Sequence, residues 1–383
     1  MKEKEYIKDV WRNLKNPEIY TVVQTAPAVR VALGEEFDMA VGTNVTGKMV
    51  SALKSLGFDR VFDTNTGADL TIMEEANEFI ERFEKQEGLP MITSCSPGWV
   101  RFAEKNYPDL LGHLSSCKSP HQMFGAMVKS YYAKKYNVDP SKICMVSVMP
   151  CIAKKYECQR EEMEVEGIRD VDYVITTREL SRMIKQANIE FTELQNDKFD
   201  EPMGEATGAG AIFGTTGGVM EAALRTAADV LENKDLPKFE YEAVRGGKER
   251  KEAVIEIAGK KVKAVVVSGL SNARKIMDEI KEGKADYQFV EIMACPGGCI
   301  MGGGQPIKSS KTRSEIDVRK LRADALYSID EKSVIRKSHE NPVIKQMYED
   351  FLQKPGSEVS HKYLHTHYSK KELYDCLLYT SPS

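Results

Sequence analysis

The residues best suited to chemistry lie in four separate loops that are rich in cysteine, proline or glycine. The loops read TSCSPGWV at 93–100, MPCIAKK at 149–155, GAGAIFGTTGG at 208–218 and MACPGGCIMGGG at 293–304. A cysteine in a turn with proline or glycine presents its sulfur outward beside backbone N–H groups, and proteins hold iron–sulfur clusters between such loops. Because the cysteines lie far apart in the sequence, only a folded scaffold can gather them. We therefore expect a buried catalytic centre.

The last of these loops carries the strongest single signal. Cys295 and Cys299 are four residues apart, unlike the CxxC of zinc ribbons, and the glycines between them let the backbone approach a bulky inorganic cluster. The alternative, a flexible glycine loop with two incidental thiols, is disfavoured because a predicted strand leads straight into the loop. A phosphate-binding loop is excluded, since no Gly-Lys-Ser or Gly-Lys-Thr follows the glycines.

Charged residues near these loops allow two interpretations each. Glu75, Glu78 and Arg82 have i, i+3 and i+7 spacing on one predicted helix face, which is typical of a solvated face with a Glu78–Arg82 ion pair. The alternative is a carboxylate relay that carries protons to a buried site. Lys154, one turn after Cys151, fits either a solvent-facing helix lysine or a hydrogen-bond donor to an anionic metal ligand.

Strands and helices alternate along the chain. Strands are predicted at 19–24, 60–62, 91–93, 145–148, 262–268 and 289–293, and helices at 45–56, 70–86, 219–231 and 271–282, with a tight turn at 208–218. This order predicts parallel sheets with helices on both faces, in which chemistry occurs at the carboxyl ends of strands. All three cysteine loops follow predicted strands. The expected fold class is α/β, with two lobes of mostly parallel sheet flanked by helices and the active site in the cleft between the lobes.

Length and composition narrow the function classes. The chain has 383 residues, room for two or three domains, and a formal net charge of -4 without a basic stripe, which argues against a nucleic-acid partner. The sequence has no signal-peptide core and no membrane-spanning apolar run, which predicts a cytoplasmic protein. Its eight cysteines are then free thiols or metal ligands. Cys117, Cys144 and Cys158 have no ligand-like setting, and Cys144 is expected to be a core thiol.

Taken in order, the four loops resemble the signature motifs of the FeFe hydrogenase catalytic domain. Further stretches that resemble this family are VQTAPAVRVALGE at 23–35, FDTNTGADLTIMEE at 62–75, KSPHQMFG at 118–125 and LHTHY at 364–368. The similarity covers roughly residues 15 to 370, nearly the whole chain. An ordered set of separate motifs is far more specific than one CxxxC spacing.

The resemblance implies a 4Fe–4S cubane joined through a cysteine sulfur to a two-iron subcluster that carries CO, cyanide and an azadithiolate bridge. The residues that match cubane ligands are Cys151, Cys295 and Cys299, with Cys299 as the bridging thiolate. The residues that match the two-iron pocket are Ala26, Pro27, Met149, Phe213, Met293 and the cyanide donor Lys154. The residues that match the proton relay are Cys95, Glu75, Ser115, Glu78 and Arg82. The implied reaction is 2H⁺ + 2e⁻ ⇌ H₂, with Cys95 passing protons to the bridging amine.

The first loop departs from the commonest form of the family. That form has two adjacent cysteines, the proton carrier and the fourth cubane ligand, whereas this chain has Cys95 followed by Ser96. A serine oxygen is a harder donor than a thiolate and is less readily deprotonated. Ser96 could ligate as an alkoxide, Cys95 could turn inward to ligate and leave the proton role to Ser96 or water, or the cluster could keep three protein ligands. We favour a thiol that is drawn onto the metal.

The domain assignment and the partners follow from the same resemblance. Residues 1–18 are assigned to an N-terminal helix, 19–370 to the catalytic domain with a lobe boundary near 186–202, and 371–383 to an unstructured, non-native tail that holds Cys376. Either an external ferredoxin delivers electrons to this domain, or the chain is the C-terminal part of a longer protein, of which 1–18 is a remnant. Iron–sulfur or flavin subunits of an NAD-linked enzyme are alternative electron partners, and maturation proteins are also implied.

Two other classes share these motifs. One is a sensory relative with slow turnover, and the other is a non-catalytic relative that assists iron–sulfur assembly. The sequence carries no added sensor module and its carboxylate relay is complete, which favours an enzyme. Lys154, Phe213 and the TAPAVR segment, which belong to the two-iron pocket, argue against the assembly class.

Overall fold

Two four-stranded sheets form the centre of the protein. The computed structural model describes residues 4–232, 234, 240–246, 248–257 and 259–372. The first sheet has the order β2–β1–β4–β7 and its neighbours are parallel. The second has the order β3–β10–β9–β8, in which β8 runs antiparallel to β9. The strands are β1 (Tyr20–Thr25), β2 (Arg60–Asp63), β3 (Met91–Ile92), β4 (Ile143–Met149), β7 (Tyr173–Thr176), β8 (Arg250–Ile257), β9 (Lys260–Ser268) and β10 (Phe289–Met293), with β5 (Glu164–Val165) and β6 (Ile168–Arg169) as a separate hairpin.

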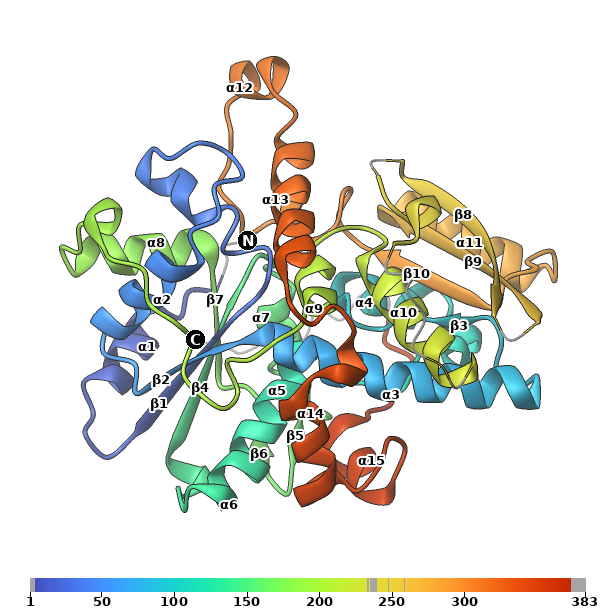
Figure 1. Ribbon diagram of the computed structural model, residues 1–383, viewed down its shortest axis with the longest axis horizontal. Helices are drawn as coiled ribbons and strands as arrows, with labels where there is room; N and C mark the ends of the chain where they lie inside the picture. Colours follow the sequence, from blue (N-terminus) through green and yellow to red (C-terminus); the bar gives the residue numbers. More distant parts are fainter. Residues whose placement is uncertain (1–3, 233, 235–239, 247, 258, 373–383) are drawn as a thin grey trace.

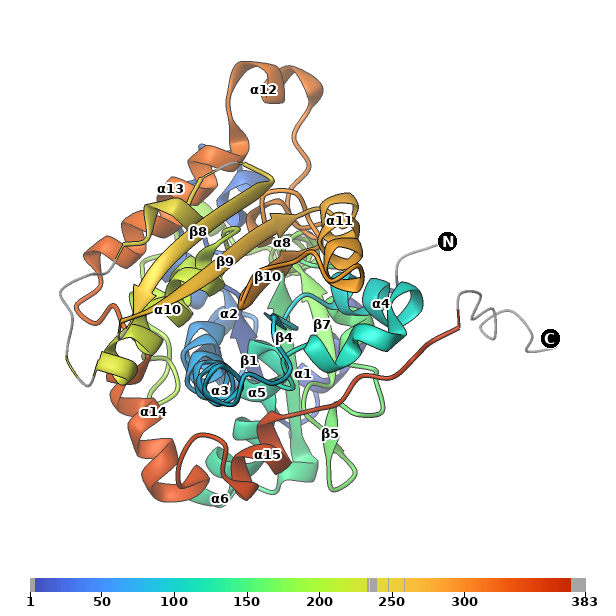
Figure 2. The ribbon, with the colours of Figure 1, turned by 90° about the vertical axis from the view of Figure 1, so that its right-hand side faces the viewer.

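Helices cover both sheets, and one of them joins the two halves. Figure 1 shows the first sheet at left and the second at right, with α3 running from one toward the other; in Figure 2 α3 is seen nearly end-on. This helix packs against α5, α9 and α10. The helices are α1 (Ile7–Leu14), α2 (Thr46–Ser55), α3 (Thr64–Lys85), α4 (Pro97–Asn106), α5 (Pro120–Met127), α6 (Ala133–Lys135), α7 (Lys154–Glu157), α8 (Thr177–Gln186), α9 (Gly208–Ile212), α10 (Gly218–Glu232), α11 (Leu270–Lys281), α12 (Ser310–Glu315), α13 (Val318–Lys332), α14 (Pro342–Met347) and α15 (Glu358–Leu364).

The strands read as continuous apolar runs because helices bury both faces of each sheet. Every residue of β4 and of β10 is buried. On β10, Val290 faces the cluster that includes Trp99 of α4. Phe289 points the other way and stacks on Phe79 of α3, with ring centroids 5.0 Å apart. The predicted α/β class with parallel sheets flanked by helices is therefore confirmed.

Two helices differ from the sequence prediction. The pattern predicts a start at residue 70 for the third helix, whereas α3 begins at Thr64. Its N-cap is Asp63, whose side chain accepts a 2.9 Å hydrogen bond from the Asn65 backbone N–H, a favourable start. The first turns carry small or polar side chains, so hydrophobic periodicity could not find them. The predicted tight turn at 208–218 is likewise wrong in part, since its first five residues form α9.

The ends of the described chain are packed onto the fold. Tyr6, which caps α1, and Ile7 and Val10 of α1 are buried in the core beside the first sheet. Residues 373–383, including Cys376, lie outside the described residues. Among the residues that are described, no helix is long and apolar enough to cross a membrane.

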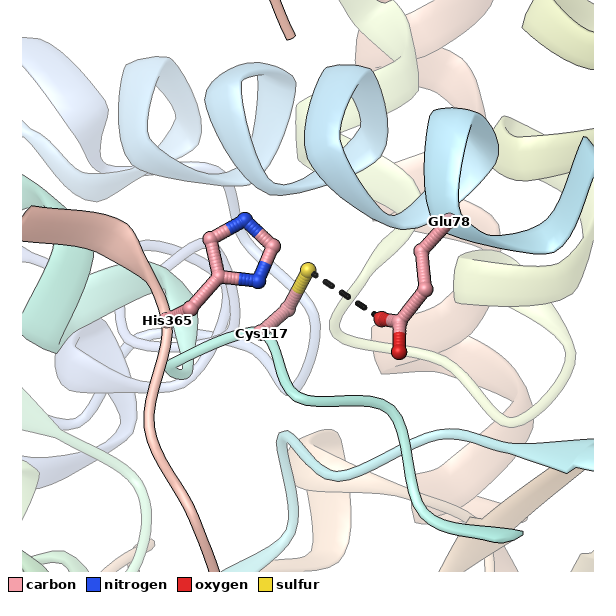
Figure 3. A group of neighbouring side chains, drawn as sticks. All are labelled: Glu78, Cys117 and His365. Atoms are coloured by element: carbon pink, nitrogen blue, oxygen red, sulfur yellow. Dashed lines mark hydrogen bonds between the residues drawn. The ribbon is translucent and has the colours of Figure 1, made fainter. Parts of the chain in front are cut away.

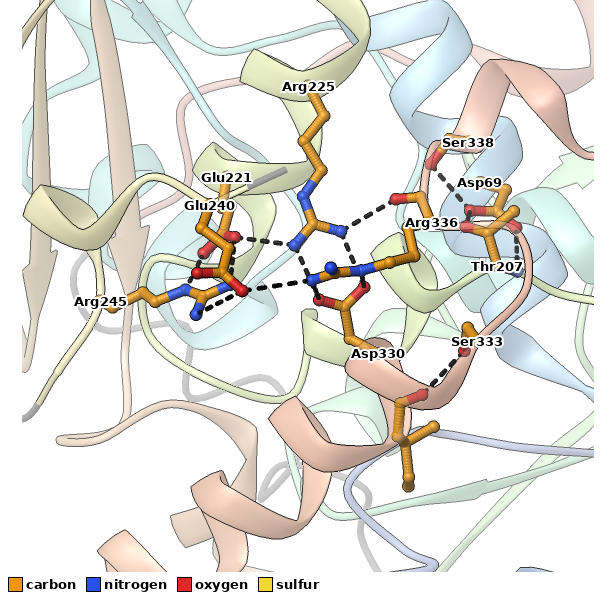
Figure 4. Close-up of polar contacts among 11 residues, drawn as sticks. Asp69, Thr207, Glu221, Arg225, Glu240, Arg245, Asp330, Ser333, Arg336 and Ser338 are labelled. Atoms are coloured by element: carbon orange, nitrogen blue, oxygen red, sulfur yellow. Dashed lines mark hydrogen bonds and ion pairs between the residues drawn. The ribbon is translucent and has the colours of Figure 1, made fainter. Parts of the chain in front are cut away.

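A buried ion network fixes α10 against α13 (Figure 4). Arg225 of α10 donates to both carboxylate oxygens of Asp330 and to Glu221 Oε1, each at 2.8 Å. Arg245 donates to the same Glu221 at 2.7 Å, and Arg336 donates to Asp330 at 2.6 Å. The side chains of Arg225, Glu221 and Asp330 are fully inaccessible to solvent. The network positions the 213–218 loop, which precedes α10 and contributes to the functional cavity.

Candidate active site

A cavity of about 260 Å³ lies where loops from both sheets meet. It is formed by loops at the carboxyl ends of β1, β3, β4 and β10, as expected for parallel sheets. The structure brings together in its wall all the residues that the sequence assigned to a cluster or to the two-iron pocket. These residues are Ala26, Pro27, Cys95, Ser96, Met149, Cys151, Lys154, Phe213, Met293, Cys295 and Cys299.

Backbone hydrogen bonds hold these loops to one another. The Ala26 N–H donates to the Val148 carbonyl at 3.0 Å, which ties the loop after β1 to the end of β4. The Gly304 N–H donates to the Pro150 carbonyl at 2.7 Å, which joins the last cysteine loop to the second. The Ala294 N–H donates to Ser96 Oγ at 3.2 Å and joins the last loop to the first. The ligand candidates are thus fixed by the scaffold.

The thiols are buried close together. Burial, followed by the nearby Cys151 and Cys295 thiols, raises the pKa of the Cys299 thiol to about 12. Three thiols crowded into a desolvated space need a bound cation to hold them as thiolates.

Backbone without side chains forms part of the cradle around these thiols. A Cβ on Gly298 would lie 2.7 Å from Thr216 N, and one on Gly302 would lie 2.3 Å from the Pro150 oxygen. Only glycine therefore lets these two segments pack so closely. Thiol donors with close backbone approach fit an iron–sulfur cluster held between loops.

Lys154 is buried at the cavity wall, so the solvent-facing interpretation of this residue is wrong. Its ammonium donates to the Cys95 carbonyl at 3.0 Å and to Glu157 Oε2 at 2.8 Å. Glu157 also pairs with His121 Nε2, and although burial opposes ionisation, Lys154 and His121 lower the pKa of Glu157 to about 2. Two of three ammonium donors are thus occupied by described residues, and one is left for a ligand in the cavity.

The helix face that carries Glu75, Glu78 and Arg82 is only partly solvated. Glu75 is 1 % exposed, and its Oε2 has no hydrogen-bond partner among the described residues. Ser115 hydrogen-bonds Glu75 and donates to Glu78 Oε2 at 2.7 Å. Arg82 in turn donates to Glu78 Oε1 at 2.7 Å. The predicted Glu78–Arg82 pair is therefore present, at the outer end of a buried acid–hydroxyl–acid series.

Electrostatics connect this series to the first cysteine loop. Burial, with the Glu78 charge second, raises the pKa of Glu75 to about 8, against the smaller opposing effect of Ser115 and Arg82. Burial also raises the pKa of the Cys95 thiol well above its usual range, and Glu75 is the largest charge that adds to this. Glu75 is thus electrostatically coupled to both Cys95 and Glu78, and at neutral pH it is mostly protonated.

Sequence reasoning did not find two polar groups beside the site. The first is the buried His121–Glu157 pair that holds Lys154. The second is Cys117, which was judged to have no ligand-like setting but lies near Glu78 and His365. The KSPHQMFG and LHTHY motifs contain both histidines. No spacing rule links them to their partners, because the partners come from distant segments.

Comparison with known protein families identifies the family to which this chain belongs. Residues 19–303 match the family profile described as "Iron only hydrogenase large subunit, C-terminal domain". The chain belongs to this hydrogenase family. A second profile, "Iron hydrogenase small subunit", matches residues 316–371. The hydrogenase fold of this chain therefore includes, in one polypeptide, a segment that resembles the small subunit of other iron hydrogenases.

Relatives and solved structures support the same family. Iron hydrogenase 1 of Clostridium pasteurianum is 49% identical over 370 residues, which cover 97% of this chain and 64% of the relative. The NADP-reducing hydrogenase subunit HndD of Solidesulfovibrio fructosivorans is 50% identical over 376 residues, with coverage of 97% and 63%. The chain thus spans less than two thirds of these relatives. A solved structure of a HydA1 FeFe hydrogenase variant from Chlamydomonas reinhardtii superposes with a TM-score of 0.85 at 40% identity, covering 97% of this chain and 100% of that chain.

A more distant group of relatives consists of iron–sulfur cluster assembly factors. The cytosolic Fe-S cluster assembly factor narfl of Danio rerio is 31% identical over 362 residues, which cover 92% of this chain and 86% of the relative. The hydrogenase relatives are clearly more similar to this chain than the assembly factor is.

Proposed function

We propose that this protein catalyses the reversible reduction of protons to H₂. One observation carries the proposal. The cavity that gathers three cluster thiols is flanked by Cys95, and a buried series of acid and hydroxyl groups leads from Cys95 toward Arg82 at the surface. A hydrogen-turnover site needs both a redox-active metal cofactor and such a route for protons.

The residues present fit the cofactor of FeFe hydrogenases. Cys151, Cys295 and Cys299 would hold a 4Fe–4S cubane, and Cys299 would also bridge to a two-iron subcluster with CO, cyanide and an azadithiolate bridge. When bound, this cofactor supplies low-potential electrons and an open iron position at which protons and electrons combine. The thiolates themselves supply the negative charge and soft donors that such a cluster prefers.

The remaining wall residues would orient and shield the two-iron subcluster. Ala26, Pro27, Met149, Phe213 and Met293 present mainly apolar groups that exclude water. Lys154 would donate its remaining N–H to a cyanide ligand, a charge-assisted hydrogen bond in a dry pocket. Because Glu157 and the Cys95 carbonyl fix the lysine from the other side, its ammonium cannot easily leave this position.

Protons would move between the cavity and the surface through Cys95, Glu75, Ser115, Glu78 and Arg82. Glu75 can release or accept a proton near neutral pH because its pKa is raised to about 8. Ser115 then passes a proton by accepting from one carboxyl group and donating to the other. Arg82 keeps Glu78 in place at the outer end.

The fourth cubane position is open to two donors. Ser96 lines the cavity, and its Oγ accepts from Ala294 N at 3.2 Å. Glu75 is the largest charge that raises the pKa of the Cys95 thiol, which supports Cys95 as the proton carrier and leaves Ser96 as the fourth donor. If Cys95 ligates in its place, Ser96 or water must carry the proton.

Electrons would come from a ferredoxin or from iron–sulfur and flavin subunits of an NAD(P)-linked enzyme. Support comes from one relative, which is a subunit of an NADP-reducing hydrogenase. We further propose a cytoplasmic location and installation of the two-iron subcluster by maturation proteins. An assembly role or a sensory role is less well supported, because the assembly relative is less similar and the acid series is continuous.

The deciding experiment is an infrared spectrum of protein purified anaerobically after co-production with the maturation proteins. Bands of metal-bound CO and cyanide, together with H₂ production from a reduced dye, are expected. An intact cubane without such bands would contradict the proposal and would favour the assembly role.

A further inference from the structure

Three side chains able to ligate a metal converge at the outer end of the acid series (Figure 3). Glu78 of α3, Cys117 before α5 and His365 after α15 have ligand atoms that all lie within 4.8 Å of one another. Cys117 is 1% exposed, and the His365 and Glu78 side chains are 6% and 14% exposed. A carboxylate, a thiol and an imidazole are thus held together in a mostly desolvated place.

Backbone pairing fixes two of the three. Cys117 and His365 are opposite each other in an isolated antiparallel bridge. The bridge is extended by Thr366 N–H donating to the Ser116 carbonyl at 2.7 Å and Lys118 N–H donating to the Leu364 carbonyl at 2.8 Å. Opposed residues in such a bridge have neighbouring Cβ atoms, so their side chains share one face. The thiol and the imidazole are therefore neighbours because of the fold.

The imidazole is oriented by a carboxylate on its far side. His365 Nε2 pairs with Glu74 Oε2 at 3.0 Å, and Nδ1 pairs with Ser116 Oγ at 2.8 Å. Glu74 is held by Tyr348 OH at 2.5 Å and Gly356 N–H at 2.8 Å. Burial opposes ionisation of Glu74, but hydrogen bonds from His365 and Tyr348 outweigh this effect and lower its pKa, so the carboxylate stays ionised. With Nε2–H donating to a carboxylate, Nδ1 carries the lone pair that accepts from the Ser116 hydroxyl, and a metal ion would take the place of that hydrogen bond.

Solvent reaches this cluster directly. A surface pocket of about 290 Å³ is lined by Glu74, Glu78, Arg82, Ser116, His361 and His365. Cys117 is not among the residues that line this pocket. A cation from solvent would meet Glu78 and His365 first, and a water molecule in the pocket would supply a fourth ligand.

We propose that Glu78, Cys117 and His365 form a binding site for a borderline-soft divalent cation, with Zn²⁺ as the best-fitting ion. One thiolate, one imidazole and one carboxylate with a water match the tetrahedral preference of Zn²⁺, whereas Ca²⁺ and Mg²⁺ prefer oxygen ligands alone. Ligand bonds of about 2.0–2.3 Å place ligand atoms about 3.5 Å apart, so modest side-chain rotations close the site. Binding releases the Cys117 proton.

The site has a consequence for turnover, and this part rests on the proposed function. Glu78 is the outer carboxylate of the proposed proton relay. A Zn²⁺ ion on Glu78 occupies its oxygen lone pairs and adds positive charge beside Ser115. Protons would then no longer pass, so Zn²⁺ inhibits H₂ turnover without touching the iron–sulfur cofactor.

The binding experiment uses enzyme that carries its cofactor, so that Cys151, Cys295 and Cys299 are occupied. Zn²⁺ is titrated in, loosely bound metal is removed, and zinc per chain is measured by elemental analysis. Cys117→Ser and His365→Gln keep size and hydrogen bonding but weaken ligation. Each should lower zinc affinity about tenfold or more, whereas His367→Gln, an exposed histidine two residues away, should not.

Turnover is measured in the same samples. Inhibition by Zn²⁺ that is lost in Cys117→Ser and His365→Gln supports the site and the relay together. Zinc that binds through these residues without inhibition supports the site and contradicts the relay role of Glu78. Equal zinc uptake in all variants, or no uptake by the original enzyme, overturns the proposed site.

Discussion

The Ser115 hydroxyl joins Glu75 to Glu78, with a 2.7 Å hydrogen bond to Glu78 Oε2. Burial raises the pKa of Glu75 to about 8, and the Ser115 hydroxyl donates to Glu78. One hydroxyl thus connects a buried acid with the acid that pairs with Arg82. In the proposed relay, this hydroxyl would pass protons between the two carboxyl groups.

Glu78→Gln should lower H₂ turnover about a hundredfold or more, because an amide keeps the shape of the side chain but cannot take up the proton. The measurement is H₂ production with a reduced dye, normalised to the infrared bands of the loaded cofactor. Glu81→Gln is the matched control, since Glu81 lies on the same helix in an exposed pair with Lys85. Equal rates for the two variants would exclude Glu78 from proton transfer.

Glu75 should make the stability of the cofactor-free chain depend on pH. Burial, then the charge of Glu78, raises the pKa of Glu75 to about 8 in the folded chain. In the unfolded chain its pKa is near 4.3, so between about pH 4.3 and pH 8 the folded chain binds a proton that the unfolded chain has lost. The contribution is full below the unfolded pKa and is lost as pH rises, at up to about 1.4 kcal/mol per pH unit. Glu75→Gln, which cannot ionise, should therefore be increasingly more stable than the original chain as pH approaches 8. Thermal unfolding midpoints of both proteins across neutral pH test this, and parallel curves would contradict it.

Much of the fold could be read from the sequence because both sheets are buried on both faces, which leaves apolar runs such as β10 at 289–293. The cysteine loops were visible because glycine and proline mark them. The environment of Glu75 was not, since its helical spacing is the same for a solvated face and a buried one. The contact between Cys117 and His365 could not be predicted either, because it joins segments far apart in sequence through one isolated bridge.

Arg225→Met should destabilise the protein by about 3–5 kcal/mol, because Glu221 and Asp330 would remain buried without their shared cation. Lys320→Met is the matched control. Lys320 pairs with Asp324 on the solvent-exposed side of α13, where water screens the ion pair and it contributes little to stability. Thermal unfolding of both variants should separate them clearly. Similar midpoints would mean that the network in Figure 4 contributes little to stability.

Ser96→Cys should make the protein hold its cubane more firmly, because a thiolate replaces a harder oxygen donor beside Cys151, Cys295 and Cys299. Iron loss to a chelator should be about tenfold slower or more. Replacing a residue that only hydrogen-bonds a metal ligand already changes metal affinity by about this factor, and a change of the ligand itself should have at least as large an effect. Ser130→Cys, remote from the cavity, controls for an added thiol.

The Cys95→Ser substitution, made both in the original chain and in the Ser96→Cys variant, then decides which residue is the fourth ligand. If Ser96 ligates, Cys95→Ser lowers turnover but leaves iron retention unchanged whether residue 96 is serine or cysteine. If Cys95 ligates, Cys95→Ser strips iron in the serine background and has little effect once a cysteine at position 96 can take over. The same iron-release measurement separates the two cases. The effect of Cys95→Ser on iron release depends on the residue at position 96 only if Cys95 is a metal ligand. We expect the first pattern, because the charge of Glu75 couples electrostatically to the Cys95 thiol, as a proton carrier requires.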